Sequence, residues 1–276
     1  MRKFLYATLI ILFVSSCFLP ETASAYLVDW YFNPNGTGYP SANALKVHNW
    51  LDLFGTSFIE VYPAGGTFSE YGVLQANGYD GSYSFPGTAN QITTVFSAGG
   101  VLSSASSFTF TSGTAKVYSD SPADYPTFNN SDGSMMQADD GTLIGTFNFA
   151  KGGGLLNPDY TPNGLISIVL EAQSLKSGYF FDSAGNDLSQ WTLTSGNLPM
   201  LTLGFISTNA TPNNNPPSEL IAEYIENFGV PHNTPVYFLV GNNGQFRVDV
   251  VPEPTSMLLF GIGTLGLAVL RRRKVA

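Results

Sequence analysis

Short runs of Val, Ile, Phe, Tyr and Thr recur between Tyr26 and Val250, separated by clusters of Gly, Asn, Asp, Pro and Ser. Phe108 and Phe110 alternate with Thr109 and Thr111, a period of two that buries one face of a strand and exposes the other. Such runs predict strands over 26–30, 57–62, 67–74, 92–96, 106–111, 115–118, 143–149, 165–172, 201–206, 236–240 and 245–249. Many short strands favour a mainly all-β domain, a β-sandwich or jelly roll.

Pairs of Asn or Asp with glycine mark the expected turns, because both residue types tolerate a positive φ. The pairs are Asn35-Gly36, Asn77-Gly78, Asp80-Gly81, Asp132-Gly133, Asp140-Gly141, Asn163-Gly164 and Asn243-Gly244. The apolar run 236–240 and the alternating run 245–249 flank a Gly-Asn-Asn-Gly segment. This arrangement predicts a β-hairpin over 236–250.

Two segments have helical spacing of their apolar residues. In 217–229, Leu220, Tyr224 and Phe228 recur every four residues, Ser218 can cap the start and Gly229 the end. This segment predicts one short amphipathic helix. The second segment, 44–54, fits a helix and a strand about equally well.

The beginning of the chain has the pattern of a secretory signal peptide, with two basic residues before an apolar run from Phe4 to Val14. Ala23-Ser24-Ala25 obeys the small-x-small cleavage rule. This site predicts residues 1–25 as the signal peptide and Tyr26 as the first residue of an extracytoplasmic domain, 26–250. A competing lipobox would make Cys17 a lipidated first residue.

Residues 251–276 form a tail of three parts: Pro252-Glu253-Pro254, an uncharged apolar run from Met257 to Leu270, and a basic cluster of Arg271, Arg272, Arg273 and Lys274. As a helix the apolar run is ~20–25 Å long, against ~30 Å for the hydrocarbon core of a bilayer. Flanking residues extend it to a marginal membrane helix. Clustered basic residues favour a cytoplasmic C-terminus, with the bulk of the chain outside.

This three-part order resembles the sorting tail of PEP-CTERM proteins, which Gram-negative, exopolysaccharide-producing bacteria export. The resemblance implies that an exosortase, a membrane cysteine transpeptidase, recognises Pro252, Glu253 and Pro254 and passes the protein to the cell surface. The chain would then be the substrate of another enzyme, anchored in the membrane before processing and placed at the surface or in the extracellular matrix afterwards.

Charge and cysteine content narrow the chemistry of the domain. Between Tyr26 and Val250 five basic residues face eighteen acidic ones, a net charge of −13. Binding to nucleic acid requires a basic surface, so nucleic-acid partners are excluded, whereas neutral glycans, divalent cations and basic partners stay compatible. The chain's one cysteine is Cys17, so the domain contains neither a disulfide nor a cysteine nucleophile.

Candidate catalytic and metal-binding groups are few. His48 and Asp52 share a face if 44–54 is helical, but no nucleophile elbow accompanies them, so a secreted hydrolase is the weakest hypothesis. We expect no catalytic residues and no cofactor. Asp182 and Asp187, in a glycine-containing loop, are candidate calcium ligands, although Asp is also common in ordinary turns.

A second resemblance concerns the body of the chain. The segments 30–36, 49–55, 66–72 and 178–187 are similar to flocculation-associated PEP-CTERM proteins. The similarity implies a non-enzymatic role in biofilm or floc formation with exopolysaccharide or other matrix components. The aromatic residues and strand-rich texture also fit a glycan-binding, lectin-like module, which is the alternative.

Overall fold

The computed structural model describes residues 25–26, 29–39, 44–82, 84–85, 89–104, 106–122, 125, 137–158, 162–190, 199–212, 222, 224–226, 228–229 and 236–250. Contacts group Tyr26–Val250 into one compact unit. Its strands are β1 (Ala25–Tyr26), β2 (Trp30–Phe32), β3 (Leu45–Val47), β4 (Leu51–Tyr62), β5 (Thr67–Tyr79), β6 (Gln91–Ser104), β7 (Ser107–Asp120), β8 (Thr142–Leu156), β9 (Pro162–Leu175), β10 (Phe180–Phe181), β11 (Pro199–Pro212) and β12 (Val236–Val250). Short 3₁₀ turns include η1 (Pro63–Gly65) and η3 (Leu188–Gln190).

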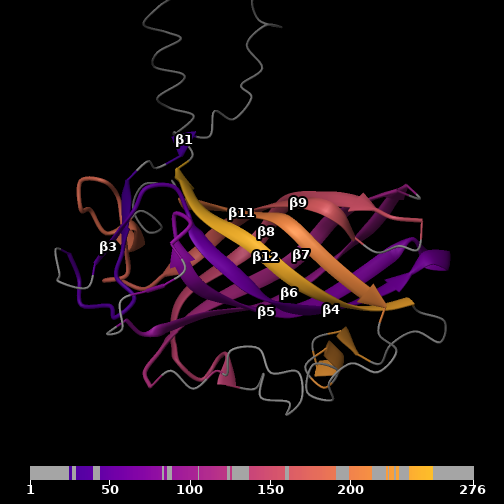
Figure 1. Ribbon diagram of the computed structural model, residues 1–276, viewed down its shortest axis with the longest axis horizontal. Helices are drawn as coiled ribbons and strands as arrows, with labels where there is room; N and C mark the ends of the chain where they lie inside the picture. The colour runs from indigo at the N-terminus through magenta and orange to yellow at the C-terminus, as the bar shows by residue number, and fades with distance from the viewer. Residues whose placement is uncertain are drawn as a thin grey trace, which may run out of the picture. The chain divides into compact units, whose positions relative to one another are not determined.

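Eight long strands form a closed antiparallel barrel (Figure 1). Around the barrel the order is β12-β11-β9-β8-β7-β6-β5-β4, and β12 pairs again with β4 to close the ring. Each of these strands therefore has a hydrogen-bonded neighbour on both sides. Closure removes the exposed strand edges that would otherwise invite aggregation.

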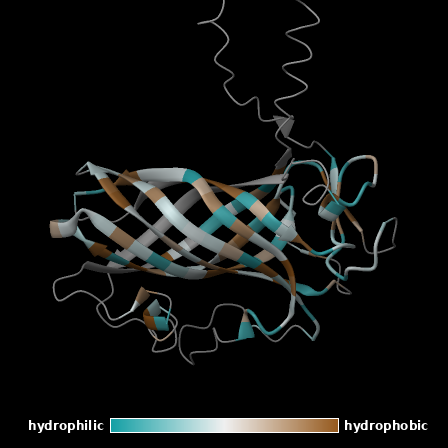
Figure 2. Ribbon diagram, turned by 180° about the vertical axis from the view of Figure 1, so that it is seen from behind, coloured by the Kyte–Doolittle hydropathy of each residue, from teal (hydrophilic) through white to brown (hydrophobic). Residues whose placement is uncertain are grey.

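Alternation along each strand decides which side chains fill the barrel. On β5 the inward positions include Phe68, Leu74 and Ala76, all buried in the main core. Figure 2 shows the resulting alternation of hydrophobic and hydrophilic bands along the strands. With eight strands the interior is just wide enough for side chains to fill, so the barrel encloses the apolar core itself.

Aromatic rings fill the half of the barrel near the turns that follow β4 and β6. The ring centroid of Phe68 lies 5.2 Å from that of Phe108 and 5.3 Å from that of Phe110, both with edge-to-face geometry. Glycine makes room for these rings: a Cβ on Gly154 would lie 2.9 Å from the ring of Phe108. The glycines of the inward-facing strand positions are therefore a packing requirement of large rings in a narrow barrel.

A small three-stranded sheet, β10-β2-β3, caps the other end of the barrel. Its inward residues join the barrel core, and Trp30 and Phe32 are both 0 % exposed. The ring of Trp30 lies 6.2 Å from that of Phe246 on β12 and 6.5 Å from that of Phe180. The cap thus extends the barrel core instead of forming a separate hydrophobic centre.

Asp80 holds the segment that leads from the cap into the barrel. Its carboxylate accepts hydrogen bonds from the backbone N–H groups of His48 (2.7 Å), Asn49 (2.7 Å) and Trp50 (3.1 Å). The residue itself has a positive φ of 51°, which Asp and Asn tolerate better than most residues. Three backbone donors between β3 and β4 therefore depend on one side chain.

Replacing Asp80 by alanine should lower the free energy of unfolding by about 1–3 kcal/mol, because it leaves partly buried donors without an acceptor. Chemical denaturation measures this change. Asp80→Asn retains one acceptor oxygen and the tolerance of positive φ, so it should cost less. Asp80→Gly relieves the backbone but removes the acceptor; if it were as stable as the native protein, the hydrogen bonds would not be the cause.

Two segments outside the barrel cover its outer wall. Tyr224 is buried against Phe58 on β4, with ring centroids 5.2 Å apart, and its hydroxyl donates a hydrogen bond to the carboxylate of Glu60. Between β7 and β8, Tyr125 and Ala138 are buried against Val73 on β5. The outward faces of β4 and β5 are therefore partly covered, which explains why β4 is buried on both faces from Gly55 to Val61.

The predicted hairpin over 236–250 is wrong: these residues form the single strand β12. The Gly241–Gly244 segment continues through the sheet, with Asn242 paired to Thr208 on β11 and to Gly55 on β4. A local hairpin would pair 236–240 with 245–249 and leave β4 and β11 without their neighbour. Closure of the barrel satisfies more backbone groups than the local turn would.

In other segments too, strands form where local sequence patterns predicted a turn, a helix or a break between strands. The helical alternative for 44–54 is wrong, because β3 and the start of β4 occupy it, while the strand alternative is confirmed. Asn77-Gly78 and Asn163-Gly164 lie inside β5 and β9 and make no turn, whereas Asn35-Gly36 and Asp80-Gly81 do. The predicted runs 106–111 and 115–118 belong to one strand, β7. Asp132-Gly133 lies outside the described residues.

The mainly all-β prediction is confirmed, with one difference in arrangement: one sheet closes on itself where a sandwich or jelly roll would pack two sheets. The described residues of the predicted amphipathic helix, Ala222, Tyr224–Glu226 and Phe228, are helical, and Gly229 follows with a φ of 81°. The predicted membrane helix at 257–270 lies outside the described residues. Among those that are described, no helix is long and apolar enough to cross a membrane.

Candidate functional site

The residues predicted for sorting and processing lie almost entirely outside the described part of the chain. These are Cys17, Ala23, Pro252, Glu253, Pro254, Arg271, Arg272, Arg273 and Lys274, while Ala25 and Tyr26 form β1. β12 ends at Val250, directly before this tail. The roles of the sorting and processing residues therefore remain predictions. The described domain contains three further places to consider as catalytic or binding sites.

The first is the loop after β10, which contains the candidate calcium ligands. Asp182 accepts hydrogen bonds from the backbone N–H groups of Ala184 (2.9 Å) and Asn186 (2.8 Å) and from the Asn186 side chain (2.8 Å). Asp187 accepts from Ser177 Oγ (2.6 Å), Gly178 N (2.8 Å) and Ser189 N (2.9 Å). Both carboxylates therefore hold the loop together, as expected of Asp in a turn.

The electrostatics of this loop agree with its hydrogen bonding. Burial works to raise the pKa of the Asp187 carboxyl, but the hydrogen bonds from Ser177, Ser189 and Gly178 outweigh it, and the pKa lies below its usual value. Within the described residues, no group of three or more His, Cys, Asp or Glu side chains is gathered as a metal site would require. Calcium binding by Asp182 and Asp187 stays an untested prediction.

The second place is His48, which the structure does not bring together with Asp52. His48 Nδ1 lies 2.6 Å from Asp29 Oδ1, and Lys46 Nζ lies 3.2 Å from Asp29 Oδ2. Asp52 instead accepts hydrogen bonds from Trp50 Nε1 (3.1 Å) and Gly81 N (2.9 Å). The hydrogen bonds from His48 and Lys46 hold the pKa of Asp29 below its usual value. The His48–Asp52 pair of the hydrolase hypothesis is therefore not formed.

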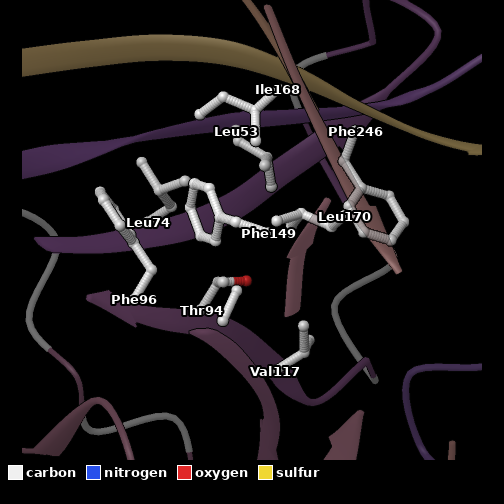
Figure 3. Close-up of a pocket in the computed structure, with 10 residues that line it drawn as sticks. Leu53, Leu74, Thr94, Phe96, Val117, Phe149, Ile168, Leu170 and Phe246 are labelled. Carbon is white, nitrogen blue, oxygen red and sulfur yellow. The ribbon is translucent and has the colours of Figure 1, made fainter. Parts of the chain in front are cut away.

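The third place is the interior of the barrel, where at least two small cavities lie among the described residues. The first is about 10 Å³, and the side chains of seven strands converge on it, with the hydroxyl of Thr94 among carbon-only groups (Figure 3). Its lining residues are Leu53, Leu74, Thr94, Phe96, Ala115, Val117, Phe149, Ile168, Leu170 and Phe246. This volume is about that of one water-sized probe, so the barrel interior is a packed core.

The second cavity, about 20 Å³, is lined by Glu70 together with the apolar residues Ile59, Val61, Phe68, Leu102, Phe108, Leu156 and Ile166. Glu70 is 7 % exposed, and its Oε1 accepts a hydrogen bond of 2.6 Å from Ser57 Oγ. Burial raises the pKa of Glu70 to about 7, against the opposing effect of the Ser57 hydrogen bond. A protonated carboxyl is therefore favoured inside the barrel up to neutral pH.

Sequence reasoning missed Glu70, although a signal was present: it occupies an inward position of β5, two residues after Phe68. It also missed the outward face of the cap sheet, hereafter the cap face, formed by Asp29, Tyr31, Tyr39, Lys46 and His48. Tyr31 and Tyr39 come from β2 and the following loop, and their ring centroids lie 4.9 Å apart with edge-to-face geometry. Only the pairing of β2 with β3 places these residues together.

Comparison with known proteins identifies one region of the chain. Residues 250–274 match the family model described as the PEP-CTERM protein-sorting motif. No curated protein and no solved structure matches the chain. The motif indicates a surface protein that an exosortase sorts and processes, and it is consistent with export and a membrane-anchored precursor. The resemblance of the tail, stated above on its three-part order, is thereby confirmed.

Proposed function

We propose that this chain is a non-enzymatic protein of the cell surface or extracellular matrix that contributes to biofilm or floc formation together with exopolysaccharide. The observation that carries the proposal is the sorting motif over residues 250–274. The four segments similar to flocculation-associated proteins support the finer role. The packed barrel interior also supports a role that depends on the outer surface, since neither of the two cavities exceeds about 20 Å³.

On this proposal the chain has three parts: a signal peptide (1–25), an extracytoplasmic domain (26–250) and a sorting tail (251–276). β12 ends at Val250, and two prolines follow within four residues. Because proline has no backbone N–H, Pro252 and Pro254 cannot extend the pairing of β12. The two missing donors disfavour sheet pairing of Pro252-Glu253-Pro254, and we expect an unpaired peptide to favour recognition by an exosortase.

Deleting residues 252–276 should abolish delivery to the cell surface, because the deletion removes both the recognition peptide and the membrane hold. Fractionation of the producing strain, followed by immunodetection, measures the distribution. A matched variant replaces only Pro252, Glu253 and Pro254 by alanine and leaves the apolar run and the basic cluster unchanged. That variant should accumulate as a membrane-bound precursor; normal delivery of both variants would contradict the proposal.

Two further measurements separate the steps. Mass spectrometry of the mature protein should find Tyr26 at its beginning and a shortened tail at its end; a lipidated Cys17 would identify the competing signal.

A strain lacking the protein should lose its flocs. If the native chain restores them but the 252–276 deletion does not, delivery is connected with aggregation. A strain that flocculates normally without the protein would refute the finer role and leave surface sorting intact.

A glycan-binding, lectin-like module is the second candidate, and the exposed ring of Tyr39 on the cap face favours it. It is compatible with the first, since a matrix protein acts through what its surface binds. Calcium dependence is a separate element of this candidate: binding that survives a chelator would exclude Asp182 and Asp187 from a calcium role.

A further inference from the structure

The cap face has an aromatic centre that the protein core does not require. Tyr31 points away from the barrel, since its neighbours Trp30 and Phe32 point into the core. Tyr39 lies over it and over Phe181, with a centroid distance of 5.5 Å to the Phe181 ring. Tyr39 is nevertheless 38 % exposed, and Tyr31 is only partly buried. Tyr39 thus presents an aromatic ring with a hydroxyl group to solvent while contacting Tyr31 and Phe181.

Charged hydrogen-bonding groups border this aromatic centre on the same face. Tyr31 is paired directly with Lys46 across β2 and β3, so their side chains are neighbours. Lys46 and His48 both contact Asp29, and their side chains are 55 % and 60 % exposed. The backbone of Gly185 also packs against the Tyr39 ring, since a Cβ added there would collide with it. The face therefore combines stacking surface with donors and acceptors of both signs.

The charge of the domain restricts what this face can bind. Between Tyr26 and Val250 the net charge is −13, which repels polyanions at long range. The basic groups on the face, Lys46 and His48, already contact Asp29. A ligand that is flat, hydroxyl-rich and uncharged avoids this repulsion and matches both the tyrosine rings and the polar border.

We propose that the cap face binds a neutral polysaccharide, with a sugar ring stacked on the exposed ring of Tyr39 and its hydroxyl groups hydrogen-bonded to the Asp29–Lys46–His48 cluster. The inference rests on the proposed surface location, and it names the partner class and the residues of contact. Tyr39 supplies stacking area because its ring is held by Tyr31, Phe181 and Gly185. The Asp29–Lys46–His48 cluster orients the sugar through hydrogen bonds, because Asp29 contacts both Lys46 and His48.

The test uses the protein purified from the surface of the producing strain and a panel of neutral glycans: cellulose, a β-1,3-glucan, dextran and mannan. Affinity electrophoresis and sedimentation with the insoluble members measure binding. The native protein should bind at least one of them, and Tyr39→Ala should weaken that binding by about tenfold, as the loss of a stacked ring predicts. Tyr31→Ala should also weaken it, because Tyr31 supports the Tyr39 ring. Tyr39→Phe should retain most of it, because the ring remains.

Tyr62→Ala is the matched control. Tyr62 is a half-buried tyrosine at the end of β4 that lies away from the cap, so its loss should leave glycan binding unchanged. Thermal unfolding confirms that each variant is folded. No binding to any neutral glycan, equal binding by Tyr39→Ala, or preferential binding to an acidic glycan such as alginate would overturn the inference. Surface delivery of the Tyr39→Ala chain should be normal, so failure of this inference is distinguishable from failure of the proposed sorting.

Discussion

Replacing Trp30 by alanine should lower the free energy of unfolding by about 3–5 kcal/mol, the usual cost of deleting a large buried aromatic side chain. Trp30 is 0 % exposed and contacts Phe32, Phe180 and Phe246, with ring centroids 6.2–6.5 Å away. It is the largest fully buried side chain of the described residues, and it joins the cap sheet to the end of the barrel. The deletion would therefore separate two elements that share one core.

The matched variant Trp30→Phe distinguishes ring packing from hydrogen bonding. The indole Nε1 of Trp30 is buried without a hydrogen-bond partner, a costly arrangement in an apolar core. Phenylalanine keeps most of the ring contacts and removes this donor, so it should destabilise the protein far less than alanine does. Urea unfolding followed by circular dichroism measures both variants. A loss below about 1 kcal/mol for Trp30→Ala would show that the cap does not depend on this ring.

Replacing Glu70 by glutamine should remove this site's contribution to the pH dependence of stability. It should therefore raise the free energy of unfolding at alkaline pH. Burial raises the pKa of Glu70 from its ordinary value of 4.5 to about 7 in the folded protein. Below pH 4.5 the carboxyl is protonated in both the folded and the unfolded chain, so its ionisation has no effect on stability. Between pH 4.5 and 7 only the unfolded chain releases the proton, and stability falls as the pH rises.

The full loss, about 3 kcal/mol, is reached above pH 7, because the folded barrel must then hold a buried carboxylate. Glutamine cannot ionise, and its amide oxygen still accepts the hydrogen bond of Ser57. We therefore expect Glu70→Gln to exceed the native protein in unfolding free energy by about 3 kcal/mol at pH 8.5 and to equal it near pH 4. Chemical denaturation across this range measures the difference.

Glu226→Gln is the control, since Glu226 is exposed on the helical segment near Tyr224. It should leave the pH dependence of the native protein unchanged. A native protein whose stability does not fall between pH 4.5 and 7 would show that water reaches the Glu70 carboxyl in solution. We therefore expect the barrel to be most stable at mildly acidic pH.

Local sequence patterns predicted the strand positions well, and the reason is physical. An inward position of a closed barrel is buried whatever its partner strand is, so the alternation of Phe108 and Phe110 with threonine appears directly in the sequence. Tyr224 and Gly229 likewise identify their helical segment, because capping and amphipathic spacing are short-range effects. These predictions required no knowledge of which strands are neighbours.

Predictions that depended on strand partners were the ones that failed. The Gly241–Gly244 segment has good turn chemistry, yet it continues as β12 because β4 and β11 both need a neighbour there. The same applies to Asn77-Gly78, which is drawn into β5. A turn signal indicates the conformation that a segment favours in isolation. Whether the turn forms depends on the strand pairing that closes the barrel.

The amino-acid sequence alone establishes the sorting tail, the acidic charge and the all-β class and predicts a signal peptide, because each is carried by composition or by neighbouring residues. Closure of the barrel, the burial of Glu70 beside Ser57 and the meeting of Asp29, Lys46 and His48 depend on the tertiary structure. These contacts join residues on different strands, and their geometry is set by strand register, which the spacing along one chain does not encode. The sorting motif is therefore carried by the last residues of the chain, whereas the proposed binding face is formed only by folding.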